Sequence, residues 1–193
     1  KNHTRQQSMA ACHDYDQKAE KTNGGELVSS YMCSPETAAQ EFEVSKKIYA
    51  QLTGRRQSPK HDILMYRIIQ SFKPGEVSPE EAHRLGYELA MKFTGGKHQF
   101  VVSTHVDRAH IHTHIEFNST NLDCDGKFQN VKDSALILRR LNDELCRAHG
   151  LSVIEDPKPS AKQQKELAAA KYGTSFKEKL RQTIERVLPD CRN

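Results

Sequence analysis

Tryptophan is absent from this 193-residue sequence, and phenylalanine and tyrosine together make up only 7% of it. A surface that binds single-stranded nucleic acid would therefore have to stack bases on tyrosine, phenylalanine, histidine or arginine. No apolar run is long enough for a membrane helix, and no secretory signal peptide is visible. We therefore expect no insertion into a membrane.

The cysteines also exclude several kinds of protein. There are five, an odd number, and they are scattered without any Cys-x-x-Cys pair. This usage argues against a disulfide framework and a zinc ribbon, and favours reduced thiols in a cytoplasm. Internal repeats and low-complexity tracts are absent as well. The net charge of +4 is compatible with a nucleic-acid partner but does not identify one.

Histidine is the residue that the sequence concentrates in one place. Four of its ten histidines lie in the run from His105 to His114. From Ile111 onward, Ile111, Thr113, Ile115 and Phe117 alternate with His112, His114, Glu116 and Asn118. This period of two indicates a β-strand with one buried face and one polar face. Imidazole is the commonest side-chain metal ligand, so the polar face is a candidate metal site.

A second strand is predicted over Gln99–Val106, joined to the first by a short hairpin. A two- or four-residue loop places His105 directly across from His112, with Cβ atoms about 4.5–5.5 Å apart. A three-residue loop would turn His105 to the opposite face. The pattern therefore predicts that His105, His112 and His114 hold a metal ion with an open coordination position, which is typical of catalytic sites. His110 is then the spare histidine; the alternative is a polar sheet face without a metal.

Periodicity and capping signals predict helices interleaved with strands. Helices are expected over residues 9–17, 35–52, 79–93 and 132–149, and strands over residues 26–31, 63–72, 99–106, 111–118 and 151–154, with an edge strand within 121–128. This order favours an α+β, two-layer fold with helices on a sheet. Residues 1–156 are expected to form one domain. Residues 157–193 are expected to form a C-terminal helical extension, with helices over 162–171 and 175–188.

Three stretches resemble, in the same order, the three motifs of the relaxase/mobilisation nuclease family, the MobP-type conjugative relaxases of the HUH endonuclease superfamily. Asp14–Thr22 is similar to the first motif, a tyrosine followed by a basic turn. Ile68–Gly75 is similar to the second, an apolar strand ending in Ser-Phe, and His105–Asn118 is similar to the third. The likeness covers about residues 8–157. It implies a central antiparallel sheet of about five strands flanked by helices.

The resemblance also implies roles for single residues. Tyr15 would be the nucleophile, with Tyr31 as the alternative. The three histidines would hold the cation, and Asp107 would orient a histidine or help to take the tyrosine proton. Ser71 would hold DNA near the scissile phosphate. The family has a strand before its tyrosine helix, but residues 1–7 are polar, so we expect that strand to be missing.

Further residues are expected to support the site. Arg108, Lys18 and Lys21 would bind DNA phosphates and make binding depend on salt. His110, Glu116 and Asn118 would lie around the metal ligands. The cation implied is divalent: manganese, zinc, nickel or cobalt suit imidazole ligands, and magnesium is abundant.

The activity implied is nicking and rejoining of one DNA strand at the transfer origin of a plasmid or integrative element, through a 5′-phosphotyrosine adduct. The partners implied are single-stranded DNA, accessory proteins of the relaxosome and a coupling protein, in the bacterial cytoplasm. Two alternatives stay open. One is a metal-dependent phosphodiester hydrolase that uses water, and the other is a catalytically silent DNA-binding module.

Overall fold

A computed structural model describes residues 2–3, 6–55 and 62–155, and scattered positions between 168 and 184. The chain divides into two units, Lys1–Val153 and Ile154–Asn193. The helices expected over 162–171 and 175–188 lie mostly outside the described residues, so the helical extension stays a prediction. In the described part of the chain, no helix is both long and apolar enough to cross a membrane.

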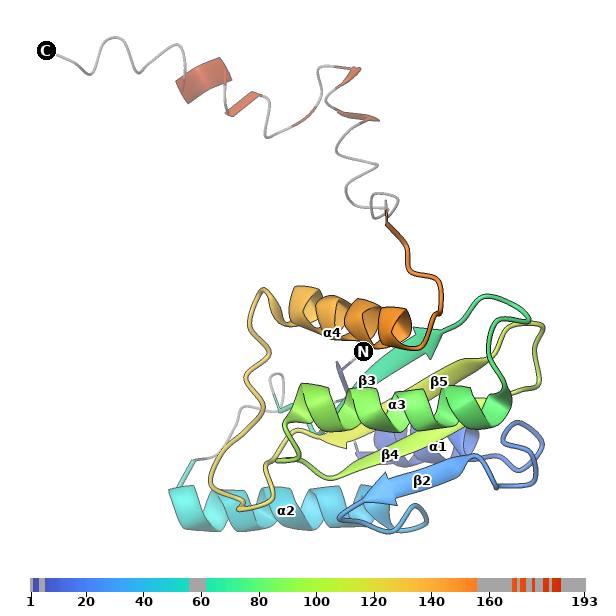
Figure 1. Cartoon of the computed structure of the whole chain (residues 1–193). Coiled ribbons are helices and arrows are strands. Elements are labelled where there is room, and N and C mark those ends of the chain that lie inside the picture. Colours follow the sequence, from blue (N-terminus) through green and yellow to red (C-terminus); the bar gives the residue numbers. More distant parts are fainter. Residues whose placement is uncertain are drawn as a thin grey trace, which may run out of the picture. The chain divides into compact units, whose positions relative to one another are not determined.

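The first unit is an α+β fold built on one antiparallel sheet, as predicted. Its helices are α1 (Gln6–Asp16), α2 (Ala38–Thr53), α3 (Pro79–Thr94) and α4 (Ser134–Ala148), and its strands are β1 (Asn2–His3), β2 (Val28–Tyr31), β3 (Met65–Ser71), β4 (Phe100–His105) and β5 (His112–Asn118). The five strands follow the order β1-β3-β5-β4-β2 (Figure 1). The histidine-bearing strands β5 and β4 are therefore neighbours inside the sheet, where a strand is held on both sides.

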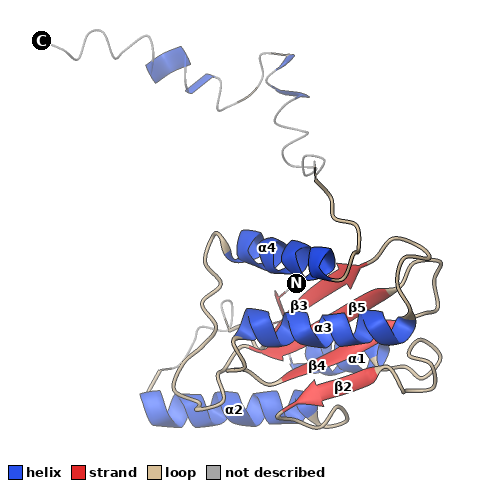
Figure 2. Cartoon of the chain, in the orientation of Figure 1, coloured by secondary structure: helices blue, strands red, loops and turns tan. Residues whose placement is uncertain are grey.

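The alternation along β4 and β5 divides the core between the two faces of the sheet. Val102, Ile115 and Phe117 pack against α3 and α4, which lie together on one face in Figure 2. Val101 contributes to a second cluster with residues of α1 and α2, including Met9 and Phe42. The polar residues of β5 face this second side, so α1 covers the face that carries the histidines.

The ends of α3 follow the capping signals in the sequence. The Ser78 hydroxyl accepts a hydrogen bond from the Glu81 amide, Pro79 occupies the first turn, and Gly95 ends the helix in the left-handed conformation. Gly54 ends α2 in the same way. Such caps satisfy backbone groups that the helix itself leaves unpaired.

The start of α2 was predicted wrongly. The sequence Ser34-Pro35-Glu36 indicates a capped helix start, yet α2 begins at Ala38. The reason is local, because the Ser34 hydroxyl bonds the Glu36 carboxylate and the Ser34 carbonyl accepts from the Thr37 amide. This turn uses the groups that would otherwise have capped the helix.

The hairpin register is confirmed, but its loop is longer than two residues. His105 pairs with His112, and the ladder ends there. Residues 106–111 form the connection because the Val106 amide donates to the Lys21 carbonyl, and Ile111 accepts from the Phe72 amide. The even number of connecting residues keeps the parity that places His105 on the histidine face.

Three predictions about short strands at the edges of the sheet were wrong. The edge strand within 121–128 is reduced to one bridge between Thr120 and Lys127. Residues 151–154 form no strand. The strand expected to be missing before α1 is present as the two-residue β1, whose Asn2 and His3 pair with Tyr66 and Met65.

Candidate active site

Three histidines converge on one face of the β4–β5 hairpin. The ring centroids are 5.0 Å apart for His105 and His112, 4.4 Å for His105 and His114, and 5.0 Å for His112 and His114. One potential ligand atom from each lies within 4.8 Å of the others. We call these three residues the histidine triad. Three nitrogen donors at this spacing fit the ligand set of a divalent transition-metal ion.

The electrostatics of the triad also fit a metal. Burial lowers the pKa of each ring below its ordinary value, and the lowered pKa of His114, about 3, also reflects the positive charge of Arg67. Neutral imidazole is the form that binds metal, because the ligand nitrogen must be deprotonated. The lowered pKa values therefore keep all three rings in the neutral form that can bind a cation at neutral pH.

Hydrogen bonds to the second nitrogen fix two of the three rings. The His105 Nε2 atom lies 2.8 Å from the Asp16 carbonyl oxygen, and the His112 Nδ1 atom lies 3.4 Å from the His110 carbonyl oxygen. A carbonyl accepts only, so each of these nitrogens carries the proton and the other ring nitrogen is left as a ligand. Metal-binding histidines commonly donate to a backbone carbonyl in this way.

His114 has a different partner. Its Nδ1 atom lies 2.8 Å from a guanidinium nitrogen of Arg67, which can only donate. This contact places the ring proton on Nε2. The Asp16 carboxylate lies 3.8 Å from the same Nδ1 atom. For His114 to bind a cation through Nε2, its Nδ1 must carry the proton and turn from Arg67 to an acceptor, which Asp16 provides.

Tyr15 lies beside the triad at the end of α1. Its ring centroid is 6.3 Å from that of His105, and 49% of its surface is exposed. The Lys21 Nζ atom lies 4.5 Å from the centroid of the Tyr15 ring. The helix that carries Tyr15 is tied to the triad, because the next residue, Asp16, accepts the hydrogen bond of His105.

Asp107 contacts Lys21 and no ring of the triad within the part of the chain described here. The Lys21 Nζ atom donates to the Asp107 carboxylate at 2.8 Å. This hydrogen bond lowers the pKa of Asp107 and raises the pKa of Lys21. A hydrogen bond with the Tyr15 hydroxyl also raises the pKa of Lys21. Asp107 is thus ionised at neutral pH and holds a cation next to Tyr15.

Beneath the triad, three buried side chains and the half-buried Arg67 form what we call the buried charge network: Asp16, Arg67, Glu116 and His13. Arg67 lies 2.5 Å from Asp16 and 3.9 Å from Glu116, which contacts His13 at 2.6 Å. Although burial opposes it, the contact with His13 keeps the pKa of Glu116 below its ordinary value. Burial and the charge of Glu116 raise the pKa of Asp16 to about 8, against the influence of Arg67.

Cys12, Asp16 and Glu116 also lie close enough to share an ion. Burial raises the pKa of the Cys12 thiol to about 12, so it does not supply the thiolate that a metal requires. Arg67 already provides positive charge beside both carboxylates, and the His13 ring contacts Glu116. Of the two groups, the triad is therefore the better candidate for a metal site.

The other predicted site residues lie at different distances from the triad. Ser71 pairs with His112 at the end of β3 and is exposed. His110 is exposed, with its ring centroid 5.2 Å from that of His112. Arg108 is exposed beside Asp107. Lys18 Nζ lies 5.9 Å from the Tyr15 ring centroid.

Asn118 does not join the triad. It lies at the far end of β5, where its side-chain amide donates to the Gln99 side chain and its side-chain oxygen accepts from the Thr120 amide. Its contacts shape the turn that leaves β5. Glu116 lies nearer the triad and contacts Arg67, which in turn contacts His114.

Asp16, Arg67 and His13 were missed by sequence reasoning. A weak signal was present, because Arg67 and Glu116 are, apart from the histidines, the charged residues within the predicted strands 63–72 and 111–118. They stand directly opposite each other in the β3–β5 register. Charged residues at buried strand positions need a partner, which points to a shared contact. Nothing in the local sequence indicated that Asp16 would be that partner.

Comparison with known proteins gives one family. Residues 11–151 match the relaxase family described as MobA/VirD2-like, nuclease domain. Protein rlx of Staphylococcus aureus is 35% identical over 158 residues, covering 81% of this chain and 45% of that protein. A second Staphylococcus aureus protein rlx is 39% identical over 127 residues, covering 66% of this chain and 38% of that protein.

A relative from another organism agrees. The group II intron-interrupted relaxase LtrB of Lactococcus lactis subsp. cremoris is 34% identical over 139 residues, covering 63% of this chain and 25% of that protein. The chain thus spans less than half of the length of these relatives. No solved structure matches.

Proposed function

Because this chain belongs to the relaxase family, with a MobA/VirD2-like nuclease domain, we propose that it nicks and rejoins one strand of DNA at a transfer origin. The observation that carries the proposal is the position of Tyr15 next to three histidines that can share one cation. The site combines a nucleophile with a place to hold the phosphate that it attacks.

His105, His112 and His114 would hold the divalent cation. Bound there, the cation would stabilise negative charge on the nonbridging oxygens of the scissile phosphate. The Tyr15 hydroxyl attacks the phosphorus in line, so that the Tyr15 oxygen–phosphorus bond forms as the bond to the 3′ oxygen breaks. The products are a 5′-phosphotyrosine and a free 3′-hydroxyl. One phosphodiester replaces another, so the strand can be rejoined by reversal without ATP.

Lys21 assists this step by its charge. A free tyrosine titrates near pH 10, so attack at neutral pH requires stabilisation of the phenolate. The Lys21 ammonium lies against the Tyr15 ring and is held there by Asp107. The exposed Tyr15 hydroxyl releases its proton to water, and the departing 3′ oxygen takes one up from water.

Tyr31 is a poorer candidate for the nucleophile. Its ring stacks on Phe100, with ring centroids 5.3 Å apart, on the side of the sheet that α3 covers. Its hydroxyl lies 3.4 Å from the Gly96 carbonyl oxygen. The triad lies on the opposite face, under α1.

The proposed reaction requires single-stranded DNA as its substrate. Arg108 and Lys18 are exposed cations next to Asp107 and Tyr15, which supports a role in binding phosphates near the scissile one. Ser71, at the edge of the triad, offers a hydroxyl to the same strand. Relaxosome accessory proteins and a coupling protein would bring the origin to this site and lead the nicked strand away.

The test compares two tyrosine variants with matched changes. Tyr15→Phe should abolish the covalent DNA–protein adduct on a denaturing gel while DNA binding is retained, and Tyr31→Phe should form adduct as the wild type does. The substrate is a single-stranded oligonucleotide that carries the transfer origin, with manganese or magnesium. Cleavage without adduct in the wild type would instead indicate a hydrolase that uses water, and binding without cleavage a silent DNA-binding module.

A further inference from the structure

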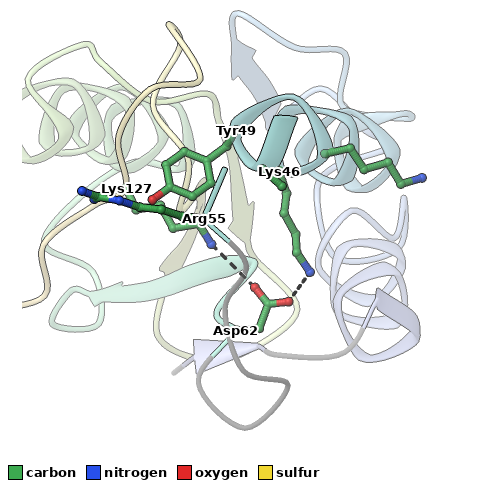
Figure 3. Close-up of a pocket in the computed structure, with 7 residues that line it drawn as sticks. Lys46, Tyr49, Arg55, Asp62 and Lys127 are labelled. Carbon is green, nitrogen blue, oxygen red and sulfur yellow. Dashed lines mark hydrogen bonds and ion pairs between the residues drawn. The ribbon is translucent and has the colours of Figure 1, made fainter. Parts of the chain in front are cut away.

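A basic pocket lies at the end of the sheet opposite the triad. It has a volume of about 260 Å³ and is lined by Lys46, Lys47, Tyr49, Ala50, Arg55, Asp62 and Lys127. These residues come from the second half of α2, from the chain that follows it and from the loop after β5. Figure 3 labels Lys46, Tyr49, Arg55, Asp62 and Lys127, whose side chains lie near one another.

The charges in this basic pocket do not balance. Four cations and one carboxylate, Asp62, line the pocket, and one of these cations, Lys47, also lies 3.9 Å from Glu43 on α2. Asp62 contacts both Lys46 and Lys127, and Figure 3 marks these two contacts as dashed lines. Arg55 has no carboxylate partner among the residues that the structure describes. The pocket thus presents surplus positive charge, in a hollow where the field of the cations is less screened than on an open surface.

Lys127 is held in place and is costly to bury. Its side chain is only 9% exposed, and its Nζ atom donates to the Ile63 carbonyl oxygen at 3.2 Å. Burial lowers the pKa of Lys127, and Asp62 opposes this effect. A second negative group in the pocket would further stabilise this buried ammonium, because buried charges are tolerated when they are paired.

We propose that this basic pocket binds a backbone phosphate of DNA, at a point distant from the scissile phosphate. Arginine and lysine together, with the Tyr49 hydroxyl as a neutral donor, are the groups that bind phosphate in proteins. The inference rests on the proposed function, because it takes the substrate of the triad to be the ligand of the pocket.

The distance between the two sites can be worked from the strand that joins them. The triad lies at the start of β5, and Ser119, which follows its end, bonds the same Ile63 carbonyl that accepts from Lys127. From His112 to Asn118 the strand rises about 20 Å. A helical strand of DNA covers this distance in about six nucleotides. The pocket is therefore expected to contact DNA that flanks the nick, in single-stranded or hairpin form.

The experiment measures how the DNA affinity depends on salt in two matched variants. Lys47→Gln with Arg55→Gln removes two charges from the pocket and leaves the pairs around Asp62 intact. Arg84→Gln with Lys92→Gln removes two exposed charges from α3, on the other face of the sheet. The probes are one labelled oligonucleotide of about 20 nucleotides, used single-stranded and as a hairpin, long enough to reach both sites.

The pocket variant should lower the slope of log affinity against log salt by about one to two units, and should lower the affinity in 0.1 M salt by about tenfold for each phosphate that it no longer binds. The α3 variant should match the wild type. Equal slopes in all three proteins, or equal reductions in both variants, would overturn the proposal. A reduction with the hairpin alone would assign the pocket to duplex DNA, and a reduction with both probes to either form.

The outcomes distinguish failure of the nicking proposal from failure of the phosphate-site proposal. If the wild type forms no adduct but the pocket variant still has a reduced salt dependence, the phosphate site stands and the nicking proposal fails. If the wild type forms adduct and the slopes are equal, nicking stands and the phosphate site fails. Thermal unfolding of both variants checks that each is folded.

Discussion

Replacing Arg67 by methionine removes the one guanidinium that joins Asp16, Glu116 and His114. Asp16 and Glu116 are almost fully buried, and Arg67 is the residue that lies between them. Methionine keeps much of the apolar stem but leaves the Asp16 carboxylate without its closest positive partner. Where Asp16 is ionised, above a pH of about 8, breaking its buried ion pair from one side costs about 3–5 kcal/mol, because a charge is left uncompensated.

That cost sets the expected size of the effect. For a domain of this size, 3–5 kcal/mol corresponds to a fall in Tm of about 6 to 20 °C. The measurement is thermal and urea unfolding followed by circular dichroism. The fall should grow as the pH rises toward and beyond 8, because Arg67 lowers the pKa of Asp16. Without Arg67 this pKa rises further, and a folded-state pKa above the unfolded value gives stability that is lost with increasing pH.

Two control variants test whether the loss of stability comes from the buried charge network. Arg84→Met removes an exposed arginine whose nearest carboxylate is Glu81, at 3.8 Å, and should cost less than about 1 kcal/mol. Adding Asp16→Leu to Arg67→Met should recover part of the stability, because the remaining Glu116 still has His13. If Arg67→Met is as stable as the Arg84 variant, the buried charge network does not act as described.

Three further predictions concern packing, the nucleophile and the metal ligands. Gly86→Ala should cost about 1–3 kcal/mol in urea unfolding although alanine favours helices, since a Cβ there would lie 2.4 Å from the Thr113 methyl; Thr113→Ser should relieve the destabilisation, and no relief would contradict this packing. Lys21→Met should slow adduct formation roughly tenfold at saturating DNA, beyond any loss of DNA affinity, and a normal rate at saturating DNA would show that the Lys21 charge does not assist Tyr15. Because burial lowers the pKa of all three triad histidines, Ni²⁺ affinity should persist as the pH falls below the ordinary histidine value, and a steep decrease at pH 6.5 would refute the lowered values.

The sequence predicts the triad because local rules decide it. Alternation along β5 and the parity of the hairpin connection place His105 opposite His112, whatever the exact length of an even loop. The capping residues around α3 are likewise local, and they form the contacts that the sequence indicates.

What the sequence does not predict depends on contacts between distant segments. The buried charge network joins α1, β3 and β5, and each of its residues alone is compatible with an exposed position. The long hairpin connection has the same origin, because the Val106 amide bonds Lys21, a residue far away in the chain. The basic pocket also combines residues of α2 and of the loop after β5, which no short motif connects.

The central claim is that Tyr15, beside a cation held by the triad, becomes joined to DNA. Mass spectrometry of the DNA-linked peptide, after incubation with an origin oligonucleotide and manganese, tests it most directly. We expect the DNA to be joined to Tyr15 by a phosphodiester, and we expect no adduct after chelation of the metal or in His112→Ala. An adduct on Tyr31, or one that forms equally well without a divalent cation, would contradict it.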